Sequence, residues 1–352
     1  MSFTSNIYNY TLEELEDIVV RGGLKKFRAT QVFEWLYRHG VDDFEMMNNI
    51  GKESKKYFKD NFACNILKIE KEQISIDGTR KYLFELYDGR FVETVLMKHD
   101  YGYSVCVSSQ VGCNMGCSFC ASGMNKKERN LEVGEMVLQV KTINDILKRE
   151  GEERVSHVVI MGIGEPFDNY DNVIKFIKII NFSKGLEIGS RHITLSTCGL
   201  VPKIKEFAFF PLQVNLAISL HFPNNELRDK YMPINKAYKI EELIEALKFY
   251  FDITNRRITF EYILLDGIND TKECAYQLID LVKDMNCYIN LIPMNEANKI
   301  FRRSSEENTK IFYETLIKHS LNVTRRKEQG HDIDAACGQL RIKRMEKNIW
   351  KD

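Results

Sequence analysis

The residues best suited to chemistry are three cysteines with the spacing Cys-x3-Cys-x2-Cys, at Cys113, Cys117 and Cys120. A tetrahedral zinc site usually takes four ligands in two separated pairs, and no second Cys-x-x-Cys or paired histidine follows to complete one. Three clustered thiolates instead fit a cubane iron-sulfur cluster, which normally takes four, so that one iron stays open to another ligand. The alternative is a buried hairpin or a structural metal knuckle.

The composition of the 352-residue chain narrows the class of protein. Lys and Arg total 50 and are balanced by 50 Asp and Glu, so no overall charge points to a nucleic-acid or membrane partner. No apolar run is long enough to span a bilayer and the N-terminus lacks a signal-peptide pattern, so we expect a cytoplasmic protein without a membrane partner. The nine cysteines are expected to be ligands, catalysts or core residues rather than a disulfide framework.

Hydrophobic periodicity divides the chain into four parts. A helical period dominates the first, turns at Asp77-Gly78 and Asp88-Gly89 separate runs of period two in the second, and strands alternate with helices in the third. Six strand-helix units predict an α/β fold in which a parallel sheet curls into a partial (β/α)6 barrel. The expected parts are a helical accessory domain over residues 1–65, a small β-meander linker over 66–100, the barrel over 101–335 and a C-terminal segment over 336–352.

Polar residues recur just past the carboxyl ends of the expected barrel strands, where the active sites of such barrels lie. Each is weak evidence alone, because a Ser or Asn at a strand end is usually a turn or cap residue. Two glycines followed by Glu165 suit backbone lying against a ligand, with a carboxylate to accept the ammonium of a bound amino acid. His221 is either a satisfied strand-end histidine or a cofactor contact. The rim residues are the three cysteines, Gly162, Gly164, Glu165, Ser196, Thr197, Ser219, Leu220, His221 and Asn295.

Basic residues gather near both ends of the chain. The first group accompanies aromatic residues and either contacts RNA or forms a solvated face over core aromatics. The second lies in the tail, which either contacts RNA or frays in solvent. Just before the tail, Ala336 and Gly338 leave Cys337 with the little steric cover that a reactive thiol needs. The first group is Lys25, Lys26, Arg28 and Arg38 with Phe27, Trp35 and Tyr37, and the second is Arg341, Lys343, Arg344 and Lys347.

The cysteine motif resembles the cluster loop of the radical S-adenosylmethionine (radical SAM) enzymes. With five other motifs, it resembles the RlmN/Cfr family of radical SAM RNA methyltransferases over nearly the whole chain. The cysteine motif marks only the superfamily, whereas Ala-Ala-Cys-Gly-Gln-Leu at 335–340 is specific to the family. The six motifs are VGCNMGCSFC at 111–120, MGIGEP at 161–166, SLH at 219–221, MPIN at 232–235, NLIP at 290–293 and DIDAACGQL at 332–340.

The resemblance implies a role for each matching residue. Cys337 would be methylated by one S-adenosylmethionine, and a 5'-deoxyadenosyl radical from a second would take a hydrogen from that S-methyl group, so that the methylene radical adds to an adenine carbon. Cys106 would then release the product by forming a transient disulfide with Cys337, and Glu93 would accept a proton. The cofactor residues would be Cys113, Cys117 and Cys120 for a [4Fe-4S] cluster, and Gly164, Glu165, Ser196, Ser219, Leu220, His221 and Asn295 for S-adenosylmethionine.

The resemblance also implies the substrates and partners. These are an adenosine in the peptidyl-transferase centre of 23S rRNA and the tRNA adenosine 3' of the anticodon, with an electron donor such as flavodoxin and a thiol reductant, and we expect a monomer. Glu165-Pro166 and the run Glu328 to His331 resemble the RlmN branch, which methylates carbon 2. The alternative is the Cfr branch, which methylates carbon 8 and confers antibiotic resistance.

Without the resemblance, other interpretations stay open. Cys106 is then a buried strand cysteine and Glu93 an exposed strand glutamate. An RNA-binding protein with a merely structural cluster would need neither Cys106 nor Cys337. In a glycyl-radical activating enzyme, the nearest enzymatic competitor, Ala-Ala-Cys-Gly-Gln-Leu would have no role. Replacement of Cys337 therefore distinguishes these classes.

Overall fold

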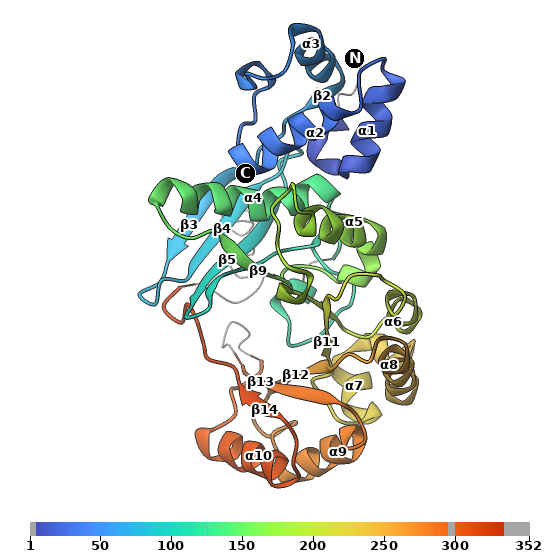
Figure 1. Cartoon of the computed structure of the whole chain (residues 1–352). Helices are drawn as coiled ribbons and strands as arrows, with labels where there is room; N and C mark the ends of the chain where they lie inside the picture. Colours follow the sequence, from blue (N-terminus) through green and yellow to red (C-terminus); the bar gives the residue numbers. More distant parts are fainter. Residues whose placement is uncertain (1–4, 125, 295–299, 334–352) are drawn as a thin grey trace.

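The structure is a computed structural model that describes residues 5–124, 126–294 and 300–333 (Figure 1). Two of the expected site residues, Asn295 and Cys337, lie outside these ranges. Among the helices of the described residues, none has the length and apolar character needed to cross a bilayer.

One ten-stranded curved sheet organises the fold, and seven of its strands are parallel. The first six of these match the predicted strands, so the expected partial barrel is confirmed. The seventh was not predicted, because its three residues pair only at the sheet edge and are too few and too exposed to show a period. In chain order they are β6 (Gly102–Cys106), β9 (Val155–Ile160), β10 (Ile193–Thr197), β11 (Asn215–Ser219), β12 (Ile258–Leu264), β13 (Cys287–Pro293) and β14 (Val323–Arg325).

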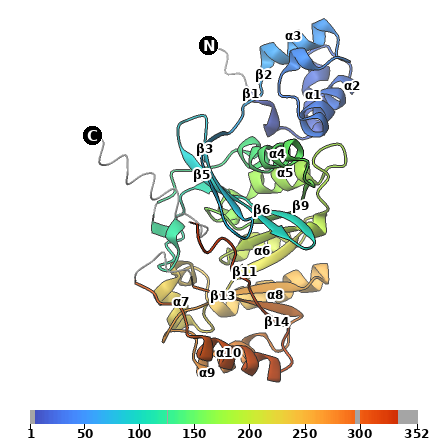
Figure 2. The same ribbon diagram turned by 90° about the vertical axis from the view of Figure 1, so that its left-hand side faces the viewer.

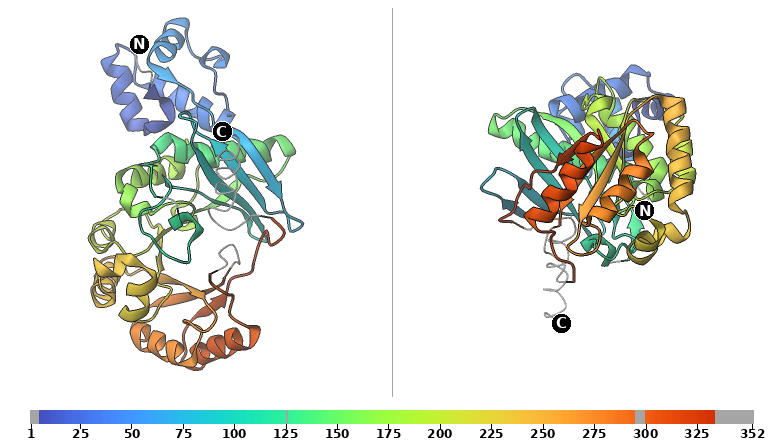
Figure 3. Two further views of the ribbon diagram at one scale, coloured as in Figure 1. Left: turned by 180° about the vertical axis from the view of Figure 1, so that it is seen from behind. Right: turned by 90° about the horizontal axis from the view of Figure 1, so that it is seen from below.

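Helices cover the outer face of the barrel sheet (Figures 1 and 3). Local signals define their ends: the Thr271 side chain caps the start of one helix, and Gly151, with φ of 76°, ends another in the left-handed conformation. The strand residues that pack beneath them, such as Val158 and Ile160, are buried, while His157 and Val159, which alternate with them, are half-buried. The helices are α4 (Val133–Glu150), α5 (Tyr170–Asn181), α6 (Val201–Phe207), α8 (Ile240–Thr254), α9 (Lys272–Val282) and α10 (Glu306–Lys318).

The predicted meander is present and continues the barrel sheet. Its strands are β3 (Lys68–Ile74), β4 (Arg80–Glu85) and β5 (Phe91–His99), and β5 pairs antiparallel with β6. The complete order is β14-β13-β12-β11-β10-β9-β6-β5-β4-β3. Residues from the meander therefore share one sheet face with residues from the barrel strands.

The N-terminal helices pack onto the start of α4 (Figures 1 and 2). Asn9 accepts a hydrogen bond from the backbone N–H of Gly134 at 2.7 Å and donates one to Glu132 at 2.8 Å. A Cβ at Gly134 would lie 2.7 Å from the Asn6 side chain, so this contact needs a glycine. Lys141 of α4 adds an ion pair to Asp42 at 2.9 Å. The helices are α1 (Leu12–Arg21), α2 (Phe27–Glu34) and α3 (Lys52–Asn61).

After β14 the chain crosses the open side of the curved sheet. Residues 326–333 run from the β14 edge to the turn between β3 and β4, which lies near the other edge (Figures 1 and 3). We call these residues the strap. The strap carries the chain toward the Cys337 segment, which follows directly.

Candidate active site

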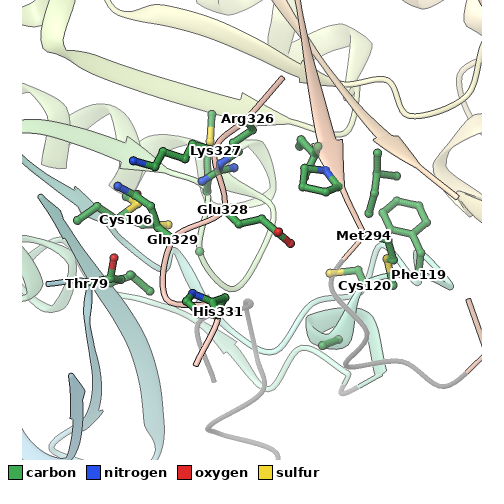
Figure 4. A pocket seen from close by; sticks show the side chains of 18 of the residues that line it. Thr79, Cys106, Phe119, Cys120, Met294, Arg326, Lys327, Glu328, Gln329 and His331 are labelled. Carbon is green, nitrogen blue, oxygen red and sulfur yellow. The ribbon is translucent and has the colours of Figure 1, made fainter. Parts of the chain in front are cut away.

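A cavity of about 340 Å³ lies between the inner face of the sheet and the strap (Figure 4). Residues at the carboxyl ends of the parallel strands meet residues of β5 there, as the barrel topology predicts. The strap crosses this space, and its Glu328 side chain lies between the Cys106 side and the Cys120 side (Figure 4). Of the predicted site and rim residues, Glu93, Cys106, Cys120, Gly162 and His221 line the cavity.

The cluster loop is held by backbone contacts. The Ser118 N–H donates to the carbonyl of Tyr231 at 3.0 Å, and the Cys120 N–H donates to the carbonyl of Cys117 at 3.1 Å. A Cβ at Gly123 would lie 2.9 Å from the Cys117 carbonyl oxygen, so the turn after the third cysteine closes tightly on the second. Tyr231 ends helix α7 (Asn225–Tyr231), which the sequence did not reveal because seven mostly polar residues carry little periodicity.

The chemistry of the three thiols fits a cluster, because clustered cysteine thiolates are its usual protein ligands. A cubane cluster binds each thiolate through a different iron, so its ligands stand farther apart than those of one ion. Burial raises the pKa of Cys113 to about 12 and that of Cys117 well above its usual value, so both are neutral until a metal displaces their protons.

Arg228 is a buried cation behind the cluster loop that the sequence did not single out. Its guanidinium donates to the carbonyls of Leu220 at 2.6 Å and Cys198 at 3.1 Å, and to Asn235 at 3.1 Å. It thereby joins the loops after β10 and β11, and its charge acts on Cys117. An arginine on a short polar helix looks solvent-exposed in sequence, so only the packing of α7 reveals it.

Glu165 joins the loop after β9 to the loop after β10. One carboxylate oxygen accepts from the Phe167 N–H at 2.9 Å and the other from the Cys198 N–H at 2.8 Å. Burial raises the pKa of Glu165, and these hydrogen bonds partly oppose the effect. A Cβ at Gly164, whose φ is 109°, would lie 2.6 Å from the Gln110 Cβ. The side chains of Thr197 and Cys198 also hydrogen-bond to this carboxylate.

His221 is a satisfied strand-end histidine that also lines the cavity, and its predicted contact with a cofactor stays a prediction. Its Nδ1 accepts a hydrogen bond from the Ile263 N–H at 3.2 Å, which satisfies one ring nitrogen and leaves the proton on Nε2. Burial, with a smaller effect of Arg228, lowers the pKa of His221 to about 3, so the ring is neutral. The ring also lines the cavity beside Phe119. Ser196 and Ser219 lie nearby, with their hydroxyl oxygens 3.3 Å apart.

Glu93 is buried, which corrects the interpretation of an exposed strand glutamate. Only 3% of its side chain is exposed, and its carboxylate pairs with the ammonium of Lys81, which is fully buried, at 2.9 Å. Cys106 is opposite Val95, and Val95 is opposite Lys81, so the three form one row across β6, β5 and β4. Glu93 lies two residues before Val95 and therefore on the same face. The site thus places a thiol, a carboxylate and an ammonium together.

Cys106 is not fully covered, because it lines the cavity (Figure 4). Burial raises the pKa of the Cys106 thiol, and the positive charge of Arg326 in the strap, the Met161 N–H and the charge of Lys81 reduce that shift. Sequence reasoning missed both cations. Lys81 lies in a strand that is buried on both faces, so no alternation marks it, and Arg326 lies in a polar run without periodicity.

Two carboxylates hold the strap against the β3–β4 turn. The Gly330 N–H donates to Asp77 at 2.8 Å, and Asp332 accepts from the Ile76 N–H at 3.1 Å and from the Ser75 hydroxyl. The last described residue, Ile333, precedes Cys337 by four residues, which span at most about 14 Å. Cys337 itself lies outside the described residues.

The basic and aromatic residues of the N-terminal helices divide between core and surface. Tyr37 is buried, and the Trp35 indole donates to Asn49 at 2.6 Å. Phe27 is 48% exposed, and the guanidinium of Arg28 lies 4.8 Å from its ring centre. Phe27 and Arg28 thus offer an aromatic face and a cation at the surface.

Comparison with known proteins agrees with this geometry. The family model described as "Radical SAM superfamily" matches residues 107–279, and that described as "Ribosomal RNA large subunit methyltransferase N-terminal domain" matches residues 5–63. The first covers most of the barrel and the second covers the N-terminal helices.

Relatives match almost the whole chain. Proteins of Acholeplasma laidlawii and Listeria welshimeri, both named "Probable dual-specificity RNA methyltransferase RlmN", are 53% and 54% identical over 96% and 97% of this chain, and 99% and 95% of their own lengths. The crystal structure of a radical SAM methyltransferase from Sphaerobacter thermophilus matches with a TM-score of 0.91 and 41% identity over 95% of this chain and 98% of that one. The chain therefore belongs to the RlmN family of radical SAM methyltransferases.

Proposed function

We propose that this protein methylates carbon 2 of adenosine in 23S rRNA, at the peptidyl-transferase centre, and in tRNA, 3' of the anticodon. Its relatives are named dual-specificity RNA methyltransferases, and its N-terminal helices match a domain named for ribosomal RNA methyltransferases. The observation that carries the proposal is one cavity lined by Cys106, Glu93 and Cys120, with the strap that leads to Cys337 across it.

The cofactors follow from the family and fit the residues present. Cys113, Cys117 and Cys120 would hold a [4Fe-4S] cluster, and the residues around Glu165 would bind S-adenosylmethionine. When bound, one S-adenosylmethionine would supply a methyl group and a second would supply an adenosyl radical. The cluster would supply the electron for that radical and take it back later. The S-adenosylmethionine residues would be Gly164, Glu165, Ser196, Ser219, Leu220, His221 and Asn295, the last of which lies outside the described residues.

Cys337 would carry the carbon unit, and its adduct with adenine explains why the site needs a second thiol and a base. A polar methyl transfer cannot reach an aromatic amidine carbon, which is not a nucleophile. Addition of the methylene radical to that carbon joins RNA to Cys337, and the RNA is free only when this link is cut. Cys106 would attack the Cys337 sulfur, and Glu93 would accept the proton of the ring carbon. Both groups lie on one sheet face, as such a step requires.

The choice of carbon 2 rests on motifs. Glu165-Pro166 and Glu328-Gln329-Gly330-His331 resemble the RlmN branch, and the curated relatives carry that name. The second candidate is the Cfr-type carbon 8 reaction. Mass spectrometry of the modified nucleoside decides between them, and 8-methyladenosine as the main product would overturn our choice.

The proposed chemistry also sets the partners. The protein would need an electron donor such as flavodoxin to reduce its cluster, and a thiol reductant to reopen the disulfide between Cys106 and Cys337. We propose that the protein works in the cytoplasm, because its substrates and both reducing partners are found there. We also propose that it works as a monomer.

The test is anaerobic reconstitution with iron and sulfide, followed by incubation with rRNA fragments, tRNA and methyl-labelled S-adenosylmethionine. We expect label on both Cys337 and adenine, and loss of both in Cys337→Ala. Cys287→Ala, which removes a buried thiol of β13 far from the cavity lining, is the matched control and should keep turnover. RNA methylation by Cys337→Ala at the normal rate would contradict the proposal and favour a structural cluster.

A further inference from the structure

The Lys81–Glu93 ion pair is the most deeply buried pair of charges beside the cavity. None of the Lys81 side chain and only 3% of the Glu93 side chain is exposed. Burying two charges costs several kcal/mol per ion, in order of magnitude, and well-packed apolar residues often give equal or better stability. Fold stability alone is therefore a weak reason for a lysine here, and its neighbours indicate another.

Lys81 contacts one of the two groups that would act in product release, and its charge acts on the other. Its ammonium lies 2.9 Å from the Glu93 carboxylate, and its charge also acts on the Cys106 thiol in the same row of the sheet. A thiolate and a carboxylate on one buried face repel each other, and both are destabilised by the loss of water. A cation shared between them offsets that repulsion.

We propose that Lys81 is a positioning residue for the release of RNA from the enzyme. It holds the Glu93 carboxylate in place and balances the charge that Glu93 and the Cys106 thiolate bring into the cavity. This role rests on the proposed function and adds a third residue to its release step.

The release step moves one proton and exchanges one bond of the Cys337 sulfur for another. The [4Fe-4S] cluster that would supply one electron would also take it back from the adduct. Glu93 then takes the proton of the ring carbon, whose C–H electron pair stays in the ring. The Cys106 thiolate then forms the S–S bond to Cys337. The bond between the Cys337 sulfur and the methylene carbon breaks, and its electron pair stays on carbon, which becomes a methyl group by taking a proton back from Glu93.

This role separates release from the earlier steps. Methylation of Cys337 and radical addition to adenine use neither Glu93 nor Cys106, so loss of Lys81 leaves both steps in place. The enzyme should then stall as a covalent protein–RNA adduct. A merely structural defect would instead reduce every step together.

The experiment uses the full chain, reconstituted anaerobically, with an rRNA fragment and S-adenosylmethionine. In Lys81→Met we expect 5'-deoxyadenosine to form while a denaturation-resistant protein–RNA adduct accumulates several-fold above the wild type, and methylated RNA falls correspondingly. Lys81→Arg, which keeps the charge, should restore most of the release. Lys141→Met is the matched control, because Lys141 is also buried and ion-paired, with Asp145 and Asp42, but lies on α4 away from the cavity lining.

A second measurement needs neither cofactor nor RNA. In the metal-free protein at neutral pH, alkylation of Cys106, followed on its own peptide by mass spectrometry, should slow several-fold in Lys81→Met but not in Lys141→Met. If Lys81→Met does not fold, Lys81→Gln replaces it, since Gln keeps a hydrogen-bond donor for Glu93 without the charge.

The outcomes separate the two proposals. Normal release and normal Cys106 alkylation in Lys81→Met, with an active wild type, would overturn the role of Lys81 alone. Equal levels of protein–RNA adduct in Lys81→Met and Lys141→Met would also overturn the role of Lys81. A wild type that never labels Cys337 or adenine would overturn the proposed function, and the role of Lys81 with it.

Discussion

Asp332 in the strap accepts a hydrogen bond from the hydroxyl of Ser75, a residue 257 positions earlier in the chain. The Ile76 N–H reaches the same carboxylate at 3.1 Å, and Asp77 of this turn accepts from the Gly330 N–H in return. Carboxylates on both sides of the contact thus bind the strap to the β3–β4 turn. The contact thereby fixes the last described residues of the chain, which precede Cys337 in the sequence.

Weakening this contact should release the strap. Ser75 and Ile76 donate to different oxygens of Asp332, so Asp332→Asn, which keeps one acceptor oxygen and no charge, loses one of these hydrogen bonds and weakens the other. We expect faster hydrogen exchange at Ile76 and in the strap, and slower formation of a Cys106–Cys337 disulfide under mild oxidation. Asp284→Asn, at an exposed position after α9, is the control. Unchanged exchange at Ile76 in Asp332→Asn would show that the strap is held by other contacts.

Asp77, the second carboxylate of the strap contact, should stabilise the fold less as the pH falls. Burial is the largest single effect and favours the neutral form of Asp77, but hydrogen bonds from Gly330, Thr79 and Ser75 together outweigh it and lower the pKa to about 2. Because the folded pKa lies below the unfolded value, Asp77 stabilises the fold fully above about pH 4, and this contribution is lost as the pH falls toward 2. The difference in unfolding free energy between wild type and Asp77→Asn should therefore shrink across that range in denaturant titrations. If the difference in unfolding free energy stayed constant over this pH range, the proposed stabilisation by the Asp77 carboxylate would be wrong.

His221 should make the protein less stable in mild acid. Burial is the main reason why the pKa of His221 in the folded protein, about 3, lies below its value in the unfolded chain. Below about pH 6.5 the unfolded chain therefore binds a proton at this histidine, whereas the folded protein does not. Between about pH 8 and pH 5 this difference lowers the free energy of unfolding by roughly 2 kcal/mol. His221→Asn, whose side-chain oxygen can accept from the Ile263 N–H, should lose less stability over the same range. Parallel curves for the two proteins would count against the neutral, buried imidazole.

Gly164 should tolerate no side chain, because its backbone lies against Gln110. In Gly164→Ala the new Cβ would lie 2.6 Å from the Gln110 Cβ while the residue keeps a φ of 109°. We expect a loss of about 2–4 kcal/mol in unfolding free energy, from backbone strain and overpacking together. Gly267→Ala is the matched control, because Gly267 also has a positive φ, of 65°, but open space around its Cβ position, and should lose only about 1 kcal/mol. Equal losses would mean that the close approach to Gln110 is unimportant.

Several features follow from the sequence by itself. The spacing of Cys113, Cys117 and Cys120 indicates the cluster, and periodicity locates six parallel strands, their helices and the meander, because each depends on residues close together in the chain. Chain direction then predicts that the loops after these strands share one rim, and Cys120 and His221 do line one cavity. The roles of Cys106, Glu93 and Cys337 came from the resemblance, because no local pattern marks them.

Tertiary structure decided which charged groups face that rim. Lys81 and Glu93 look like strand residues facing solvent until the meander joins the barrel sheet and buries both. Arg228 looks exposed until its short helix packs behind the cluster loop, and Asp332 shows no partner until the strap crosses the sheet to Ser75. These contacts join residues far apart in the chain, so local propensity and spacing carry no information about them. Only the path of the folded backbone brings such groups within a hydrogen bond of each other.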